Sequence, residues 1–136
     1  LANRHALETS EKDRSENIRR IGEISHLMID AGLVTLAAFI SPYIKDRVGV
    51  KNIVGTENFI EIYVNTSLEE CERRDVKGLY KKARAGEITN MTGVSAPYEA
   101  PENPALEIKT DKQSIAESVK IIINFLEQKI KPSIYE

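Results

Sequence analysis

The chain has 136 residues, of which 41% are hydrophobic and 29% charged, and its formal net charge is −2. This length allows one domain at most, and no apolar run of about 18 residues predicts a membrane span. The near-neutral charge argues against a dedicated nucleic-acid binder, which shows a broad basic surface. The lone Cys71 excludes an internal disulfide and is typical of a reducing compartment. With no apolar signal segment at the N-terminus, we expect a cytoplasmic protein.

The first half of the chain predicts two helices around one strand. Ile18, Ile21 and further apolar residues at helical spacing predict a helix over 11–31, which ends at Gly32. The apolar run over 33–40 predicts a strand covered on both faces, as in a parallel sheet. The Ser41-Pro42 pair predicts the cap and the start of the next helix, over about 42–53.

The second half alternates in the same way. Thr66 or Ser67 is well placed to cap a short helix, and Pro132 follows the last helix. In order, the predicted elements are a strand over 59–64, a helix over 67–74, a helix over 77–85, a strand over 106–108 and a helix over 114–131. Strands that alternate with helices predict a right-handed parallel α/β sheet, although three strands alone would close such a sheet poorly.

The most informative segment of the chain is a cationic run followed by a long loop. The twelve residues over 73–84 carry six cations against one anion, Asp75, in a chain that is mildly acidic as a whole. This local excess of positive charge predicts an anion site, with phosphate as the anion, although a solvated helix face has the same composition. Glycines and prolines interrupt the polar stretch that follows, which is typical of a lid or a binding loop.

Within this segment, KGLYKKARAGEI followed by TGVSAPYEAPENP resembles the lid region of adenylylsulfate kinases. These enzymes phosphorylate adenosine 5′-phosphosulfate (APS). Three further blocks are similar to the same family in the same order: DRSENIRRIGEI at 13–24, AGLVTLAAFISPY at 31–43 and FIEIYVNTSLEECERRD at 59–75. The resemblance therefore covers roughly residues 13–110.

The resemblance implies a three-layer α/β/α P-loop kinase fold with a parallel sheet. It implies a single kinase domain over 1–136 with a lid at about 77–104. The activity implied is ATP-dependent phosphorylation of the 3′-hydroxyl of APS to 3′-phosphoadenosine 5′-phosphosulfate in sulfate assimilation, with Mg²⁺ entering with ATP. The sequence contains no G-x-x-x-x-G-K-[ST] motif, so we expect the P-loop and its central strand to lie N-terminal to Leu1.

The resemblance also implies the site residues. Arg14 and Asn17 match the family's Asp-Arg-x-x-Asn motif, which binds APS, and lie three residues apart at a helix start. The family usually has Phe, stacked on the adenine, where this chain has Met91, so we expect looser stacking here. The full substrate-binding set is Arg4, Arg14, Asn17, Ile40, Ser41, Lys77, Asn90 and Met91, and the nucleotide-binding set is Arg73, Arg74 and Gln113.

Ser41 is the family's phosphoserine position, which would make it catalytic, but a Ser-Pro pair at a helix start is also explained as a cap. The two histidines are not at metal-ligand spacing, and no metal ligands are predicted. Expected partners are ATP and APS, without nucleic acid or membrane. The resemblance further implies a homodimer and an ATP sulfurylase as a partner or fused domain.

Two other functions remain open from the sequence. The first is a non-catalytic, kinase-like regulatory domain that binds a nucleotide, as in domains fused to ATP sulfurylases, and the missing P-loop motif would favour it. The second is another small-molecule P-loop kinase, such as a nucleoside or shikimate kinase. The sequence KGLYKKARAGEI in the lid segment disfavours it.

Overall fold

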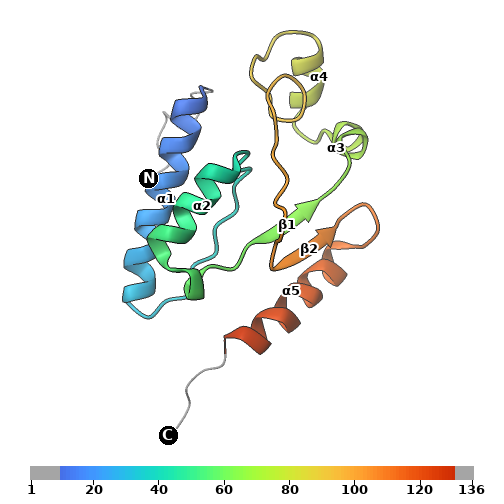
Figure 1. Cartoon of the computed structure of the whole chain (residues 1–136). Helices are drawn as coiled ribbons and strands as arrows, with labels where there is room; N and C mark the ends of the chain where they lie inside the picture. The colour runs from blue at the N-terminus through green and yellow to red at the C-terminus, as the bar shows by residue number, and fades with distance from the viewer. Residues whose placement is uncertain (1–9, 131–136) are drawn as a thin grey trace, which may run out of the picture. The chain divides into compact units, whose positions relative to one another are not determined.

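A computed structural model of the protein describes residues 10–130 (Figure 1). In chain order its elements are α1 (Glu11–Asp30), α2 (Ile44–Val54), the 3₁₀ helix η2 (Thr56–Asn58), β1 (Ile62–Asn65), α3 (Leu68–Arg74), α4 (Leu79–Arg84), β2 (Leu106–Lys109) and α5 (Ile115–Lys129). They form two compact units. One unit comprises the described residues up to 60 together with 75–102, and the other comprises 61–74 together with 103–130.

The first unit is built on the pairing of α1 with α2. Ser10 caps the start of helix α1, because its hydroxyl accepts a hydrogen bond from the Asp13 amide at 3.2 Å. The two helices approach closely at Gly22, where an added Cβ would lie 3.2 Å from Ile53 and 3.3 Å from Val50. An alanine at position 22 would therefore require the Ile53 and Val50 side chains to shift by a few tenths of an ångström.

The strand predicted over 33–40 does not form, and this prediction was wrong. The segment connects α1 to α2 without a hydrogen-bonded ladder, and all of its residues are exposed, with Leu36 at 83%. A strand is defined by a partner, and within residues 10–130 the only ladder joins β1 to β2. Apolar character alone therefore does not make this segment a strand.

The second unit contains the sheet, in which β1 and β2 pair in parallel with Ile62 opposite Leu106. Ile108 on β2 is almost fully buried, with 1% of its surface exposed. Helix α5 contacts β2 and starts with a capping box in which the Ser114 amide donates to the Glu117 carboxylate and the Glu117 amide donates to the Ser114 hydroxyl. The prediction of an α/β protein with a parallel sheet is confirmed.

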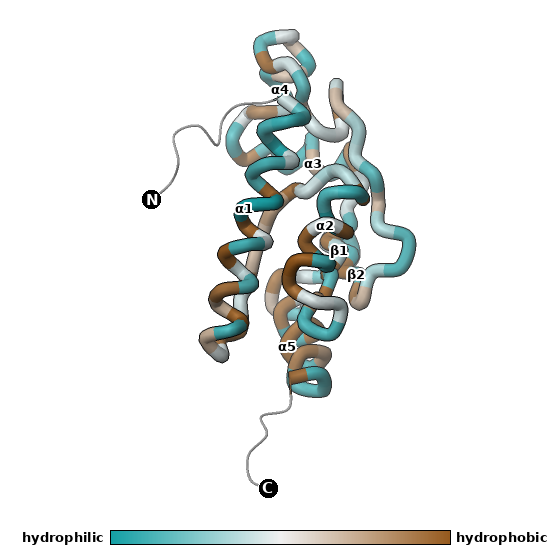
Figure 2. Tube along the Cα trace, turned by 60° about the vertical axis from the view of Figure 1, so that its left-hand side comes forward, coloured by the Kyte–Doolittle hydropathy of each residue, from teal (hydrophilic) through white to brown (hydrophobic). Residues whose placement is uncertain are grey.

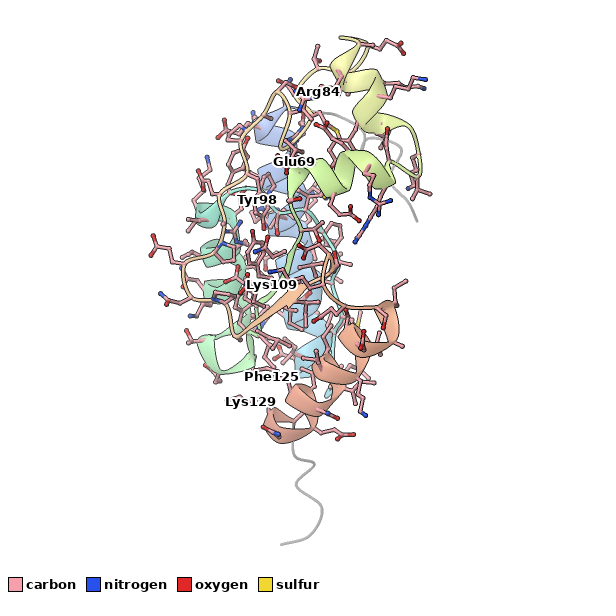
Figure 3. The ribbon with its side chains drawn as sticks, turned by 90° about the vertical axis from the view of Figure 1, so that its right-hand side faces the viewer. Glu69, Arg84, Tyr98, Lys109, Phe125 and Lys129 are labelled. Carbon is pink, nitrogen blue, oxygen red and sulfur yellow. The ribbon has the colours of Figure 1, made fainter. Side chains whose placement is uncertain are left out.

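Apolar side chains remain exposed on several elements. Figure 2 shows hydrophobic residues along α5 and on the C-terminal half of α1. On α5, Ile115 is 85% exposed, and the Lys129 ammonium lies 5.9 Å from the centre of the Phe125 ring (Figure 3). None of the described helices combines the length and apolar character needed to cross a bilayer.

The predicted helices all exist, with ends shifted by a few residues. The cap at Ser67 is confirmed, because its hydroxyl accepts a hydrogen bond from the Glu70 amide at 3.3 Å. The cap predicted at Ser41 was wrong. Helix α2 starts after Tyr43, which makes no side-chain cap bond, and the Ile44 amide donates instead to the Glu99 carboxylate at 2.7 Å.

Candidate functional site

The first candidate contact joins the start of α1 to the loop over 86–102, within one unit. The Arg14 guanidinium donates a hydrogen bond to the Thr92 hydroxyl at 2.8 Å and another to the Asn90 carbonyl. The structure thus brings two sequence-predicted residues, Arg14 and Asn90, together across 76 residues of chain. Asn17, also predicted, lies one turn further along α1 and is half-buried.

The loop residues that contact Arg14 are held by a tight turn. The Met91 carbonyl accepts hydrogen bonds from the amides of Val94, Ser95 and Ala96, and the Met91 amide donates to the Ser95 hydroxyl at 3.0 Å. Asn90 adopts a left-handed conformation with φ of 58°, which asparagine tolerates better than most residues. The carbonyl of Asn90, at the start of this turn, is the one that accepts from Arg14.

A second cluster surrounds the connection between the 33–40 segment and α2. Ser41 is half-buried and has a φ of 38°, in the left-handed region that non-glycine residues rarely adopt. Its carbonyl accepts a hydrogen bond from the buried Arg47 guanidinium at 2.6 Å. Ile40, the other predicted residue here, is 64% exposed.

The cationic run over 73–84 is divided by its one anion. The Asp75 carboxylate accepts hydrogen bonds from the backbone amides of Lys81 at 2.9 Å and Tyr80 at 3.0 Å, in the first turn of α4. The hydrogen bond from the Lys81 amide, followed by that from Tyr80, holds the pKa of Asp75 below its ordinary value. Asp75 therefore stabilises the helix start instead of neutralising the lysines. Within residues 10–130 the ammonium groups of Lys77 and Lys82, both exposed, form no ion pair.

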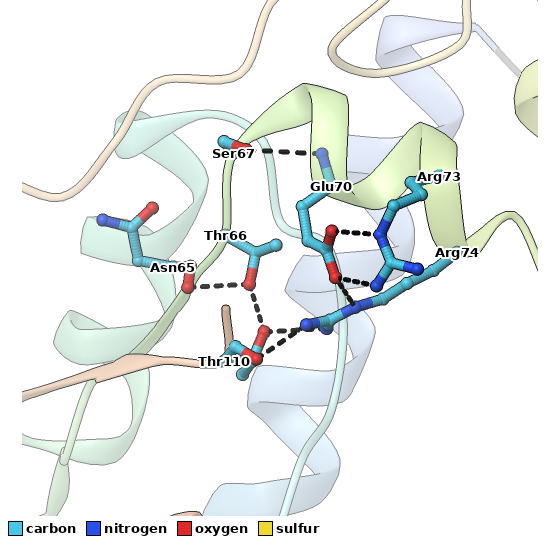
Figure 4. A network of polar contacts seen from close by, with 7 residues as sticks. All are labelled: Asn65, Thr66, Ser67, Glu70, Arg73, Arg74 and Thr110. Atoms are coloured by element: carbon cyan, nitrogen blue, oxygen red, sulfur yellow. Dashed lines mark hydrogen bonds and ion pairs between the residues drawn. The ribbon is translucent and has the colours of Figure 1, made fainter. Parts of the chain in front are cut away.

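Arg73 and Arg74 lie in the other unit, where both contact Glu70 (Figure 4). The guanidinium of Arg73 donates twice to the Glu70 carboxylate, each time at 2.6 Å, and Arg74 donates to it at 2.7 Å. Hydrogen bonds from Arg73 and then Arg74 lower the pKa of Glu70 from 4.5 to about 2. Arg74 also donates to the Thr110 carbonyl at 2.6 Å, which ties α3 to the end of β2.

The remaining predicted residues are dispersed. The Gln113 side-chain amide donates to the Ser118 hydroxyl at 3.0 Å, so it supports the start of α5. Lys77 is exposed just before α4, and Arg4 lies outside the described residues.

Several residues of these clusters lie outside the predicted set, among them Arg47, Glu70, Asp75, Thr92, Glu99 and Thr110. Glu70, Arg47 and Glu99 each contact a predicted residue or its neighbour. Asp75 instead accepts from two amides at the start of α4. Glu70 had a local signal, since a carboxylate three and four residues before two arginines predicts helical ion pairs. Arg47 and Glu99 had none, because they meet across 52 residues of chain.

No metal centre is evident among these groups. Over residues 10–130 there is no grouping of three or more His, Cys, Asp or Glu side chains that could hold a metal ion.

Comparison with known proteins identifies the class. Residues 3–109 match the family model described as adenylylsulphate kinase. The adenylyl-sulfate kinase of Staphylococcus epidermidis is 58% identical over 119 residues, which are 88% of this chain and 60% of that protein. That of Oceanobacillus iheyensis is 61% identical over 120 residues, again 88% of this chain and 60% of the relative. The chain thus spans about 60% of the length of these curated relatives.

A solved structure of the Mycobacterium tuberculosis APS kinase CysC, in complex with AMPPNP and APS, matches with a TM-score of 0.83 and 42% identity. The match covers 89% of this chain and 70% of that chain. The fold is therefore the α/β fold of the P-loop kinases. The chain belongs to the adenylylsulphate kinase family.

Proposed function

We propose that this chain carries the APS-binding part of an ATP-dependent kinase that phosphorylates the 3′-hydroxyl of APS to give 3′-phosphoadenosine 5′-phosphosulfate. The observation that carries the proposal is the contact of Arg14 with the Asn90 carbonyl and the Thr92 hydroxyl. It joins an arginine of the family's Asp-Arg-x-x-Asn motif to the loop that follows the cationic run. The relative from Mycobacterium tuberculosis, at 42% identity, was captured with APS and AMPPNP.

Arg14 is suited to the phosphosulfate end of APS. Its planar guanidinium offers several N–H donors in a fixed fork, which matches the oxygens of phosphate and sulfate groups. Asn17, on the same face of α1, supplies both a donor and an acceptor for the nucleotide. The loop completes the site with Asn90 and with Met91, whose thioether covers the adenine, while Lys77 adds a cation at the other end of the predicted lid over 77–104.

For the nucleotide donor, we propose that Arg73 and Arg74 contact ATP and that Gln113 lies near its base. In the structure Glu70 occupies both guanidinium groups. The phosphates of ATP carry more charge than one carboxylate, so they would compete with Glu70 for these arginines. Binding of ATP would then exchange one set of charge-assisted hydrogen bonds for another.

The reaction itself needs no covalent enzyme intermediate. The 3′-oxygen of APS forms a bond to the γ-phosphorus as the bond to the β–γ bridging oxygen breaks, ADP leaves, and the hydroxyl proton is released. We assign no catalytic base among the described residues. We propose that Ser41 lines the substrate site and is not phosphorylated during turnover, which trapping with labelled ATP would test against Ser41→Ala.

Mg²⁺ is proposed to arrive with ATP, as phosphoryl transfer requires. Because residues 10–130 present no metal-ligating cluster, we assign no step through the ion to them. We also propose a cytoplasmic homodimer, with an ATP sulfurylase as a partner or fused domain, on the family relationship. Light scattering of the purified protein tests the dimer, which would have twice the mass of the monomer.

The test of the function has two parts. Isothermal titration of APS into the full chain is expected to show saturable binding, whereas adenosine 5′-monophosphate, which lacks the sulfate, should bind more weakly. Release of ADP from ATP should depend on added APS. Binding of APS without ADP release would instead support the non-catalytic regulatory domain, and absence of APS binding would contradict the proposal. The intact mass of the natural protein shows whether it exceeds the 15.3 kDa of this chain.

A further inference from the structure

Arg47 is a buried cation that no part of the proposed reaction uses. Only 9% of its surface is exposed, although arginine is among the residues least often buried. Its guanidinium donates one hydrogen bond to the Ser41 carbonyl and one to the Glu99 carbonyl, both at 2.6 Å. It also lies 5.9 Å from the centre of the Tyr98 ring, within reach of a cation–π contact. Tyr98 is labelled in Figure 3.

On one side, Arg47 stabilises an unusual bend. Ser41 has a φ of 38°, a conformation that costs free energy for any residue with a side chain unless its surroundings hold it. The hydrogen bond from Arg47 goes to the carbonyl of this same residue, so it holds the bend at the point where the chain turns into α2. The bend sets where the backbone of Ile40 and Ser41 lies.

On the other side, Glu99 contacts both Arg47 and the residues that lead into α2. Its amide donates to the Pro42 carbonyl at 2.8 Å, its carboxylate accepts from the Ile44 amide at 2.7 Å, and its carbonyl accepts from Arg47. We call these contacts of Arg47 and Glu99 the clasp. Glu99 lies near the C-terminal end of the 86–102 loop, which also carries Asn90 and Met91. The clasp therefore fixes this end of the loop to the start of α2.

We propose that Arg47 is a positioning residue for the APS site: through the clasp it holds the Ser41 bend and the end of the 86–102 loop in the geometry that binds substrate. The proposal rests on the proposed function for its substrate. The two hydrogen bonds of the clasp require an arginine at position 47. Its planar guanidinium reaches both carbonyls at once, whereas the ammonium of a lysine acts as a single point of charge. In this proposal the Arg47 side chain acts through Ser41 and Glu99 and contacts neither the substrate nor the reacting atoms.

The first arm of the test does not depend on function. Arg47→Lys keeps the charge and loses the fork, and Arg20→Lys is the matched control, since Arg20 forms only an exposed pair with Glu16 on α1. Hydrogen exchange in the full chain should accelerate about tenfold at the amides of Ile44 and Glu99 in Arg47→Lys, as expected for the loss of one charge-assisted hydrogen bond. The amide of Ile18 inside α1 should not change, and Arg20→Lys should match the wild type.

The second arm measures substrate. In Arg47→Lys the Kd for APS should rise about tenfold, while the Kd for a non-hydrolysable ATP analogue stays unchanged, a split that general destabilisation does not produce. Glu99→Gln tests the clasp without replacing Arg47, since it changes the carboxylate that accepts from the Ile44 amide. It should raise the Kd for APS about threefold and speed exchange at Ile44, because a neutral acceptor makes a weaker hydrogen bond.

Unchanged exchange at Ile44 and Glu99 in Arg47→Lys would overturn the clasp whatever the protein binds. Faster exchange with an unchanged Kd for APS would overturn the positioning role alone. If the wild type binds no APS, the proposed function fails and the substrate role of Arg47 fails with it, while the exchange result still decides whether the clasp exists.

Discussion

The guanidinium of Arg14 donates a hydrogen bond to the hydroxyl of Thr92 at 2.8 Å, 78 residues further along the chain. This contact orients the arginine before any ligand is present. A preoriented side chain loses less conformational entropy on binding, so the contact bears directly on affinity.

Replacing Thr92 with valine, which has nearly the same shape, should therefore weaken APS binding. We expect the Kd for APS to rise about threefold to tenfold, because Arg14 loses one hydrogen-bond acceptor and gains freedom. Calorimetric titration measures the effect. Thr89→Val, an exposed change in the same loop, is the control and should leave the Kd as it is in the wild type. Equal affinities for the wild type and Thr92→Val would show that the contact does not prepare the site.

Met91→Phe should strengthen APS binding. An aromatic ring stacks on adenine better than a thioether does, and such stacking contributes about 1–3 kcal/mol per base. We expect at least a severalfold lower Kd for APS and no change in the Kd for an ATP analogue. An unchanged Kd for APS in Met91→Phe would contradict the placement of Met91 over the adenine.

The pair of arginines on Glu70 makes a pH-dependent contribution to the unit that contains α3. Because the pKa of Glu70 falls from 4.5 in the unfolded chain to about 2, its stabilising effect is complete above pH 4.5 and is lost as the pH falls toward 2. A carbon-13 NMR titration should place the Glu70 midpoint near pH 2. A midpoint near 4.5 would show that the arginines do not hold the carboxylate.

Glu70→Gln should release Arg73 and Arg74 for the nucleotide. If these arginines bind ATP phosphates, the Kd for an ATP analogue should fall by about threefold, since the competing carboxylate is gone. Glu69→Gln, on an exposed neighbour in the same helical turn, controls for the change in net charge. Equal effects of the two substitutions would indicate a general charge effect and no competition.

Asp75→Asn should loosen the first turn of α4. The carboxylate accepts from two backbone amides there, and its pKa lies below the ordinary value for that reason. Hydrogen exchange should accelerate at the amides of Tyr80 and Lys81. In the wild type the same acceleration should appear only when the pH falls through the lowered pKa of Asp75. Glu87→Gln serves as the control, and exchange that is equal in Asp75→Asn and the wild type would rule out this role.

Local patterns in the sequence identified the elements that depend on local interactions. The helix over 11–31 was predicted from the spacing of Ile18 and Ile21. A cap was predicted at Thr66 or Ser67, and Ser67 is the one that accepts from the Glu70 amide. Each of these signals operates within one or two helical turns, so neighbouring residues suffice to determine the structure.

Contacts between distant segments explain where prediction failed. Ser41 does not cap α2, because a carboxylate 55 residues away, that of Glu99, accepts the Ile44 amide. The run over 33–40 has the composition of a buried strand, but strand formation depends on a neighbour that composition does not specify. Arg47 was not predicted as a site residue, because its burial between the Ser41 and Glu99 carbonyls depends on segments far apart in the chain.

We propose that Arg14 is the anion ligand of the APS site, and calorimetric titration of APS into the wild type and Arg14→Lys decides whether it is. APS should bind the full chain saturably, and Arg14→Lys should raise its Kd about tenfold, because lysine replaces the guanidinium fork by a single ammonium group. The exposed exchange Arg19→Lys should leave the Kd unchanged. Equal affinity of the wild type and Arg14→Lys for APS, or no binding by either, would show that Arg14 is not an anion ligand for APS.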